Sequence, residues 1–145
     1  MRQVKRSALV PYSAMQMFDL VADVERYPAF LPWCTGAEVL ERDGELVTAR
    51  LALRRAGASA RFTTRNRLVT GEYLEMRLLE GPFRSLEGRW DFKAIGTAGS
   101  RVQLEMNFET ISSLAGLLLG PAFEGACSQL VDAFGQRARQ VYGGA

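Results

Sequence analysis

The chain of 145 residues contains no histidine, two cysteines and two lysines. Without histidine it lacks the commonest general base, the Ser-His-Asp triad and most transition-metal sites. Cys34 and Cys127 stand far apart in the sequence and form no CxxC motif, which argues against a structural zinc site. We therefore predict no metal site and no required cofactor, so that any catalysis would depend on carboxylates, Tyr, Arg or Lys.

Long apolar runs and targeting signals are also missing. The longest apolar run spans only Leu117–Leu119, whereas a bilayer-spanning helix needs roughly 20 apolar residues. The charged start of the chain is followed by no apolar stretch typical of a secretory signal. These features predict a cytoplasmic protein with two reduced thiols, folded as the single domain 1–145.

Basic charge is concentrated in one segment. Arginine supplies 16 of the 18 basic residues, and six arginines with no acidic residue lie between positions 46 and 71. Two explanations stay open for this excess. It reflects either a genomic preference for arginine together with a solvated sheet face, or an anionic partner, because the arginine fork suits phosphate.

The hydrophobic period changes twice along the chain. A first strand is expected over Gln3–Val10, and Ser13 is a suitable N-cap for a helix that ends near Asp23. A short helical turn fits between Pro28 and Pro32. The next part of the chain alternates with period two and predicts six antiparallel strands, near residues 36–41, 46–54, 58–69, 73–80, 84–94 and 101–110.

The last third predicts one long helix. From Ser113 onward its apolar residues recur at steps of three and four and form one stripe, from Leu114, Leu117 and Leu118 to Val141. Gly120-Pro121 is expected to break or kink this helix. The order of elements predicts an α+β fold, in which a curved seven-stranded antiparallel sheet wraps around the C-terminal helix and two short helices follow strand 1.

Small and bulky residues suggest an apolar pocket between sheet and helix. Many inward positions of the strands are small: Ala49, Ala58, Ala60, Thr64 and Gly88. Bulky residues are expected at the rim: Tyr27, Phe30, Trp33, Phe83 and Trp90. The alternative is a solid core in which small and large side chains interdigitate.

Reactive groups are sparse at inward positions. Most strand carboxylates share the polar face with arginine, and no carboxylate pair stands at a spacing that forces a shared site, so we predict no enzyme activity. Thr64 and Asn66 point inward by alternation, and either hydrogen-bond a ligand carbonyl or cap a bulge.

Several motifs resemble the START-like family, also called helix-grip, SRPBCC or Bet v 1-like. They cover nearly the whole chain in order: residues 8–14 (ALVPYSA), 17–24 (MFxLVxDV), 27–32 (YPxFLP), 34–36 (CTG), 56–57 (AG), 62–66 (FTTRN), 81–83 (GPF), 88–92 (GxWxF) and 133–138 (AFxxRA). This family includes bacterial ribosome-association toxins and coenzyme Q-binding proteins, within the polyketide cyclase/dehydrase superfamily. The resemblance implies a curved antiparallel sheet that grips a C-terminal helix.

The resemblance also implies three candidate functions. The first is a non-catalytic carrier of a hydrophobic ligand, ubiquinone or a related isoprenoid quinone, that supports respiratory electron transport. The second is a ribosome-association toxin that binds the large (50S) ribosomal subunit and blocks subunit joining. The third is a polyketide cyclase/dehydrase-like enzyme. A bacterial cytoplasmic protein, peripheral to the inner membrane through transient membrane contact and without a DNA partner, fits the first two.

Two sets of residues follow as candidate sites. The ligand-binding cavity is expected to involve Tyr27, Phe30, Leu31, Trp33, Leu51, Phe62, Thr64, Asn66, Met76, Phe83, Trp90, Met106, Phe123 and Leu130. The opposite sheet face is expected to contact the ribosome or another anion through Arg50, Arg54, Arg61, Arg65 and Arg67.

Overall fold

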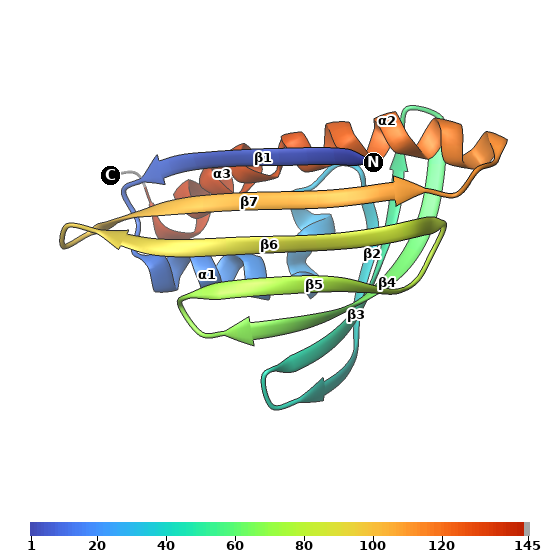
Figure 1. Cartoon of the computed structure of the whole chain (residues 1–145). Coiled ribbons are helices and arrows are strands. Elements are labelled where there is room, and N and C mark those ends of the chain that lie inside the picture. The colour runs from blue at the N-terminus through green and yellow to red at the C-terminus, as the bar shows by residue number, and fades with distance from the viewer. Residues whose placement is uncertain (144–145) are drawn as a thin grey trace.

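The computed structural model describes residues 1–143 and shows a curved sheet with helices on its concave face (Figure 1). The strands are β1 (Arg2–Val10), β2 (Cys34–Asp43), β3 (Leu46–Arg55), β4 (Ala58–Val69), β5 (Tyr73–Glu80), β6 (Phe83–Ile95) and β7 (Gly99–Thr110). The helices are α1 (Ala14–Ala22), the 3-10 helix η1 (Val24–Ala29), α2 (Leu114–Ser128) and α3 (Leu130–Tyr142). The seven strands are antiparallel in the order β1-β7-β6-β5-β4-β3-β2. The predicted α+β helix-grip fold is thus confirmed.

Local sequence explains where the elements begin and turn. Ser13 caps α1 through a capping box, since its hydroxyl accepts from the Gln16 amide at 3.1 Å and the Gln16 side chain accepts from the Ser13 amide at 2.9 Å. Ala56 and Gly57 join β3 to β4 with φ angles of 50° and 81°. Two successive positive φ angles are typical of the type I′ turn, whose twist matches that of a hairpin.

Strand β1 at one edge of the sheet and β3, next to the other edge strand, both contact α2. Arg2 on β1 forms an ion pair with Glu124 at 2.6 Å, and Arg55 at the end of β3 donates to the Ala122 carbonyl at 3.5 Å. A Cβ atom on Gly125 would lie 2.2 Å from the Arg55 guanidinium, so the glycine leaves the space that this side chain occupies. Arg55 therefore faces the helices, unlike the other arginines of the basic segment.

The long C-terminal helix is divided, but not where the sequence predicts. Pro121 lies inside α2, and the break occurs at Gln129, where α2 and α3 meet at 43°. Pro121 removes one hydrogen bond, to the carbonyl of Leu117, which lies in an exposed turn where water can replace it. At the break the Gln129 amide donates to the Ala126 carbonyl at 3.2 Å, which tightens the last turn and ends α2.

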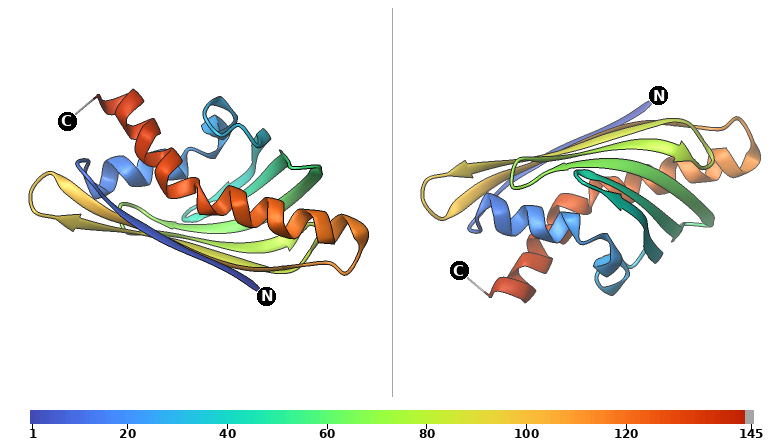
Figure 2. Two further views of the ribbon diagram at one scale, coloured as in Figure 1. Left: turned by 90° about the horizontal axis from the view of Figure 1, so that it is seen from above. Right: turned by 90° about the horizontal axis from the view of Figure 1, so that it is seen from below.

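The apolar stripe of this region is shorter than predicted. Leu114 and Leu117 are 77% and 74% exposed, and Leu118 is about half exposed. The first turn of α2 projects past the end of the sheet, so these leucines have no strand to pack against (Figure 2). Within residues 1–143 no single helix is long and apolar enough to cross a membrane; only the bent pair α2 and α3 together reaches that length and composition.

Candidate functional site

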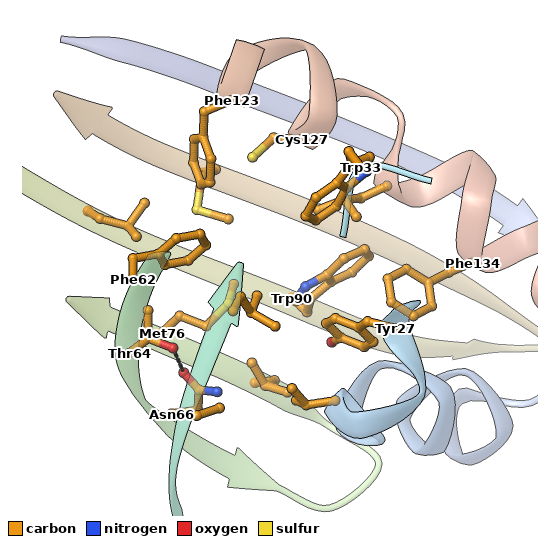
Figure 3. A pocket seen from close by; sticks show the side chains of 17 residues that line it. Tyr27, Trp33, Phe62, Thr64, Asn66, Met76, Trp90, Phe123, Cys127 and Phe134 are labelled. Carbon is orange, nitrogen blue, oxygen red and sulfur yellow. Dashed lines mark hydrogen bonds between the residues drawn. The ribbon is translucent and has the colours of Figure 1, made fainter. Parts of the chain in front are cut away.

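A small apolar cavity lies between the concave sheet face and the C-terminal helices. In Figure 3 Phe123 and Cys127 reach into it from α2, whereas Phe62, Thr64 and Asn66 come from β4. The cavity has a volume of about 60 Å³. It is lined by Val24, Tyr27, Trp33, Ala49, Leu51, Phe62, Thr64, Asn66, Leu74, Met76, Leu86, Trp90, Met106, Phe123, Cys127, Leu130 and Phe134.

All but three of the predicted cavity residues line this space. Phe30 instead lies half-buried beneath the Arg137 guanidinium, which is 5.0 Å from its ring centroid, and Leu31 is fully buried in the core. Phe83 packs against Phe108 and other rings of an aromatic cluster. These three positions were predicted from their place in the sequence pattern and from the size of their side chains. Neither property shows on which side of a neighbouring ring a side chain lies.

Five lining residues were not predicted, although their signals were present. Leu74 and Leu86 share the inward phase of their strands, and Cys127 and Phe134 belong to the apolar stripe of the C-terminal helices. Val24 opens η1 and carries no periodic signal. The predicted rim residues are also placed differently: Tyr27, Trp33, Phe83 and Trp90 are all buried within the molecule.

Two hydroxyl groups of the cavity lining donate hydrogen bonds within the protein. Thr64 donates its hydroxyl to the Asn66 side-chain oxygen at 2.8 Å, and both residues are buried (Figure 3). A register shift of β4 against β5 falls between Thr63 and Thr64, so the Thr64–Asn66 pair also flanks a bulge. The Tyr27 hydroxyl donates to the Val21 carbonyl, which occupies its only proton.

The titratable groups that line the cavity are neutral at physiological pH. Burial raises the pKa of the Tyr27 phenol above its usual value, with smaller contributions from Cys34 and Asp23. Burial likewise raises the pKa of the Cys127 thiol, and Glu124 adds to the shift. A protonated, buried thiol is a poor nucleophile, so Cys127 behaves as a small apolar residue.

The small inward residues do not leave a large hollow, because long flexible side chains fill the space. Gly88 on β6 lies beneath Met76 and Met106, and a Cβ atom there would approach Met76 Cε to 2.6 Å and Met106 Sδ to 2.7 Å. Pockets for small-molecule ligands usually enclose about 300–1,000 Å³. The cavity of about 60 Å³ is therefore much smaller than a ligand pocket when the methionines lie as they do here.

The convex side of the sheet, called the outer face below, carries rows of charged residues. One row crosses five strands through directly opposed residues and alternates in charge: Arg67, Glu75, Arg89, Glu105 and Lys5. We call it the alternating row. Opposite charges directly across two strands stabilise a sheet modestly, so this row largely neutralises itself.

Arg89 shows how fully the alternating row is paired. Its guanidinium lies 3.6 Å from Glu75 and 3.0 Å from Asp91, and 4.1 Å from the centroid of the Tyr73 ring. Each contact engages a face or an edge of the guanidinium group. Few of the N–H groups of the Arg89 guanidinium therefore remain free to bind an external anion.

Four neighbouring arginines of β3, β4 and β5 on the outer face have no such partners. None of them forms an ion pair with any residue in the described range 1–143, and all four are exposed: Arg54, Arg61, Arg65 and Arg77. We call this set the arginine strip.

Two of the five arginines predicted to contact anions do have partners. Arg50 lies 3.5 Å from Glu38 and Arg67 lies 3.9 Å from Glu45. Both acids precede the basic segment, so the local count of charges did not include them. Conversely, Arg77 on β5 lies outside the segment and joins the arginine strip because it stands directly opposite Arg65.

The chain matches known proteins over almost its full length. The family model described as "Polyketide cyclase / dehydrase and lipid transport" matches residues 10–135. A relative named ribosome association toxin RatA from Pseudomonas aeruginosa is 49% identical over 140 residues, covering 97% of each chain. This chain belongs to the polyketide cyclase/dehydrase and lipid transport family.

Two more distant matches carry other names. Coenzyme Q-binding protein COQ10 homolog B, mitochondrial, of Xenopus laevis is 27% identical over 146 residues, which cover 97% of this chain and 59% of that protein. The crystal structure of Zhui aromatase/cyclase from Streptomyces superposes with a TM-score of 0.86 at 22% identity and covers 99% of both chains. At that identity the structural likeness shows the shared fold and does not choose between functions.

Proposed function

We propose that this protein associates with the large ribosomal subunit through its outer face and thereby interferes with subunit joining. The relative from Pseudomonas aeruginosa, named a ribosome association toxin, supports this function because it shares nearly half of its residues with this chain over its whole length. The observation that carries the proposal is the arginine strip, four exposed arginines without an ion pair among the described residues.

The position of the arginine strip suits docking onto a large, negatively charged body. The strip lies on β3, β4 and β5, and the helices cover the opposite face of the same sheet (Figure 2). Unpaired surface arginines favour encounter with an anionic partner, and the attraction weakens as salt increases. A protein held on the large subunit in this way would block the small subunit sterically wherever the two surfaces overlap.

Sedimentation tests the proposal. The purified protein is expected to co-sediment with isolated large subunits, and Arg61→Glu combined with Arg65→Glu is expected to raise the dissociation constant at least about tenfold, a change of about 1.4 kcal/mol in binding free energy. Both residues are exposed, so the variant should keep its melting temperature.

A matched charge reversal gives the control. Lys93 and Arg101 also stand directly opposite each other on the outer face, at the far end of β6 and β7. The variant Lys93→Glu with Arg101→Glu changes the net charge equally but leaves the arginine strip intact. Equal loss in both variants would show that net charge alone drives binding, and undiminished binding of Arg61→Glu with Arg65→Glu would contradict the proposal.

We propose as a second candidate that the cavity takes up an apolar ligand, such as an isoprenoid quinone, after Met76 and Met106 move. The specific observation is an uncharged lining that ends in the buried Thr64–Asn66 pair. Methionine side chains change rotamer easily and repack around ligands. The coenzyme Q-binding relative, at 27% identity, is consistent with this use of the fold.

Solvent extraction of the purified protein tests this candidate. We expect a quinone or another isoprenoid lipid in the extract of the wild-type protein and less of it from Gly88→Ala, because the added methyl group would push both methionines further into the cavity. Gly135→Ala is the control, since a Cβ atom there meets nothing within 4 Å. Extracts with no isoprenoid lipid from either protein would exclude the carrier function.

A further inference from the structure

We infer that the arginine strip binds the phosphate backbone of RNA, so that ribosomal RNA rather than a ribosomal protein is the element it contacts. This inference rests on the proposed function, which requires only that the outer face meets the large subunit. It concerns the chemistry of the partner, and it assigns a role to Arg77, which the charge pattern of the sequence did not indicate.

The first argument is the unfavourable pairing of Arg65 with Arg77. The register of β4 and β5 places these residues directly opposite each other, where like charges destabilise a sheet. On its other side Arg77 stands opposite Glu87 of β6, but neither Glu87 nor any other acidic residue in the described range forms an ion pair with Arg65 or Arg77. A polyanion that places a separate phosphate beside each guanidinium group would remove this repulsion, because phosphate oxygens accept strong hydrogen bonds from arginine.

The second argument is the shape of the outer face beside Arg61. A shallow hollow lies between Arg61 and the Arg50–Glu38 ion pair, and its floor is low because Gly36 and Ala52 carry little or no side chain. Arg61 and Arg65 are four residues apart on one strand, which separates them by about 13 Å. A chain of regularly spaced phosphates can therefore follow β4 and contact arginines at both ends of this stretch.

The third argument is the sharp edge of the basic surface. From Arg77 onward the outer face contains a second hollow, whose charged lining consists of three glutamates (Glu75, Glu87 and Glu105) and two arginines (Arg77 and Arg89). Arg89 is paired with Glu75 and Asp91, so the acidic side chains outweigh the free basic ones there and disfavour phosphate. The charges thus restrict the predicted RNA contact surface to β3, β4 and the adjoining part of β5. This surface is as wide as a single polynucleotide strand or one edge of a groove, and it is much narrower than the whole sheet.

The salt dependence of binding to a protein-free RNA tests this inference. For a short fluorescent RNA duplex, each phosphate contact contributes about −0.9 to the slope of log K against log salt, so four contacts predict a slope of about −3.6. Arg77→Gln should reduce the slope to about −2.7, because one contact is lost. Lys93→Gln is the control, and we expect no change in its slope.

Parallel sedimentation with intact large subunits separates the two claims. If the wild-type protein binds subunits in a manner that needs Arg65 but does not bind the RNA duplex, the partner is an acidic protein surface and the RNA inference is overturned while the proposed function stands. If the duplex binds with a slope that Arg77→Gln leaves unchanged, the arginine strip is not the RNA site. If the wild-type protein binds no subunits at all, the proposed function itself fails.

Discussion

The two faces of the sheet use the same strands for different purposes. The inner face is apolar and nearly filled, and its cavity of about 60 Å³ has no charged residue in its lining. The outer face carries most of the charge, and only part of it is neutralised within the protein. The alternating row sets opposite charges across neighbouring strands and contains the Glu75–Arg89 ion pair, whereas the arginine strip has no ion pair among the described residues. The inner face should therefore determine the stability of the fold, and the outer face should determine association with the ribosomal subunit. Substitutions on one face should change one of these properties and leave the other unchanged.

The largest expected effect is on the inner face. Phe123 lies at the centre of an aromatic cluster, with ring centroids 4.7 Å from Phe108, 5.0 Å from Phe83 and 5.5 Å from Phe62. Phe123→Ala should lower the free energy of unfolding by about 3–5 kcal/mol in a urea titration, because it leaves a cavity in a packed core. Leu117→Ala on the exposed side of the same helix is the control, with an expected change of less than about 0.5 kcal/mol. Equal losses in both would mean that the first turns of α2 are covered in solution.

An intermediate effect is expected at alkaline pH. Burial raises the pKa of Tyr27 and of Cys127 in the folded state, so the folded protein keeps both protons where the unfolded chain loses them. Stability is therefore unaffected by these groups below about pH 8 and falls as pH rises past the unfolded pKa values, by up to about 1.4 kcal/mol per pH unit for each group.

Variants at these two positions sharpen that prediction. Tyr27→Phe should lower stability at pH 7, because a hydrogen bond to Val21 is lost, yet make the decline between about pH 9 and pH 11 shallower. Cys127→Ala should flatten the part of the decline that begins at lower pH. A decline with the same slope in wild-type protein and both variants would mean that other groups control alkaline unfolding.

The smallest effect compares two arginines of the outer face. Arg89→Glu would place three acids opposite one another, next to Asp91, and should cost about 1 kcal/mol of unfolding free energy with little change in subunit binding. Arg65→Glu would place opposite charges across β4 and β5 and should leave stability unchanged or slightly higher, while subunit binding falls. If Arg89→Glu lowered subunit binding and Arg65→Glu lowered stability instead, the division between the alternating row and the arginine strip would be contradicted.

The sequence predicted the elements of this fold well because their signals are local. Alternation along β3, β4 and β7 identified the inward residues, and Ser13 was recognised as the cap of α1. The predicted position of the helix break, at Gly120-Pro121, was wrong, because the break lies at Gln129. Proline is a strong local signal, but the bend at Gln129 depends on how α2 and α3 pack against the curved sheet, which no local pattern encodes.

The candidate sites were predictable only in part, since they depend on pairing between strands. Inward phase placed most cavity residues correctly, but the volume left between them follows from how Met76 and Met106 pack over Gly88. On the outer face, the sequence could not show that Arg50 has a partner or that Arg77 stands opposite Arg65. Both facts follow from strand register, which is set by the bulges and turns of the folded sheet.

A reconstruction of the complex between this protein and the large ribosomal subunit, by electron cryomicroscopy, would test the central claim most directly. We expect the outer face of β3, β4 and β5 to lie against ribosomal RNA, with Arg61, Arg65 and Arg77 near backbone phosphates and the helices turned away. A complex in which the exposed leucines of α2 or the glutamate-lined hollow meets the subunit, with the arginine strip in solvent, would contradict the account.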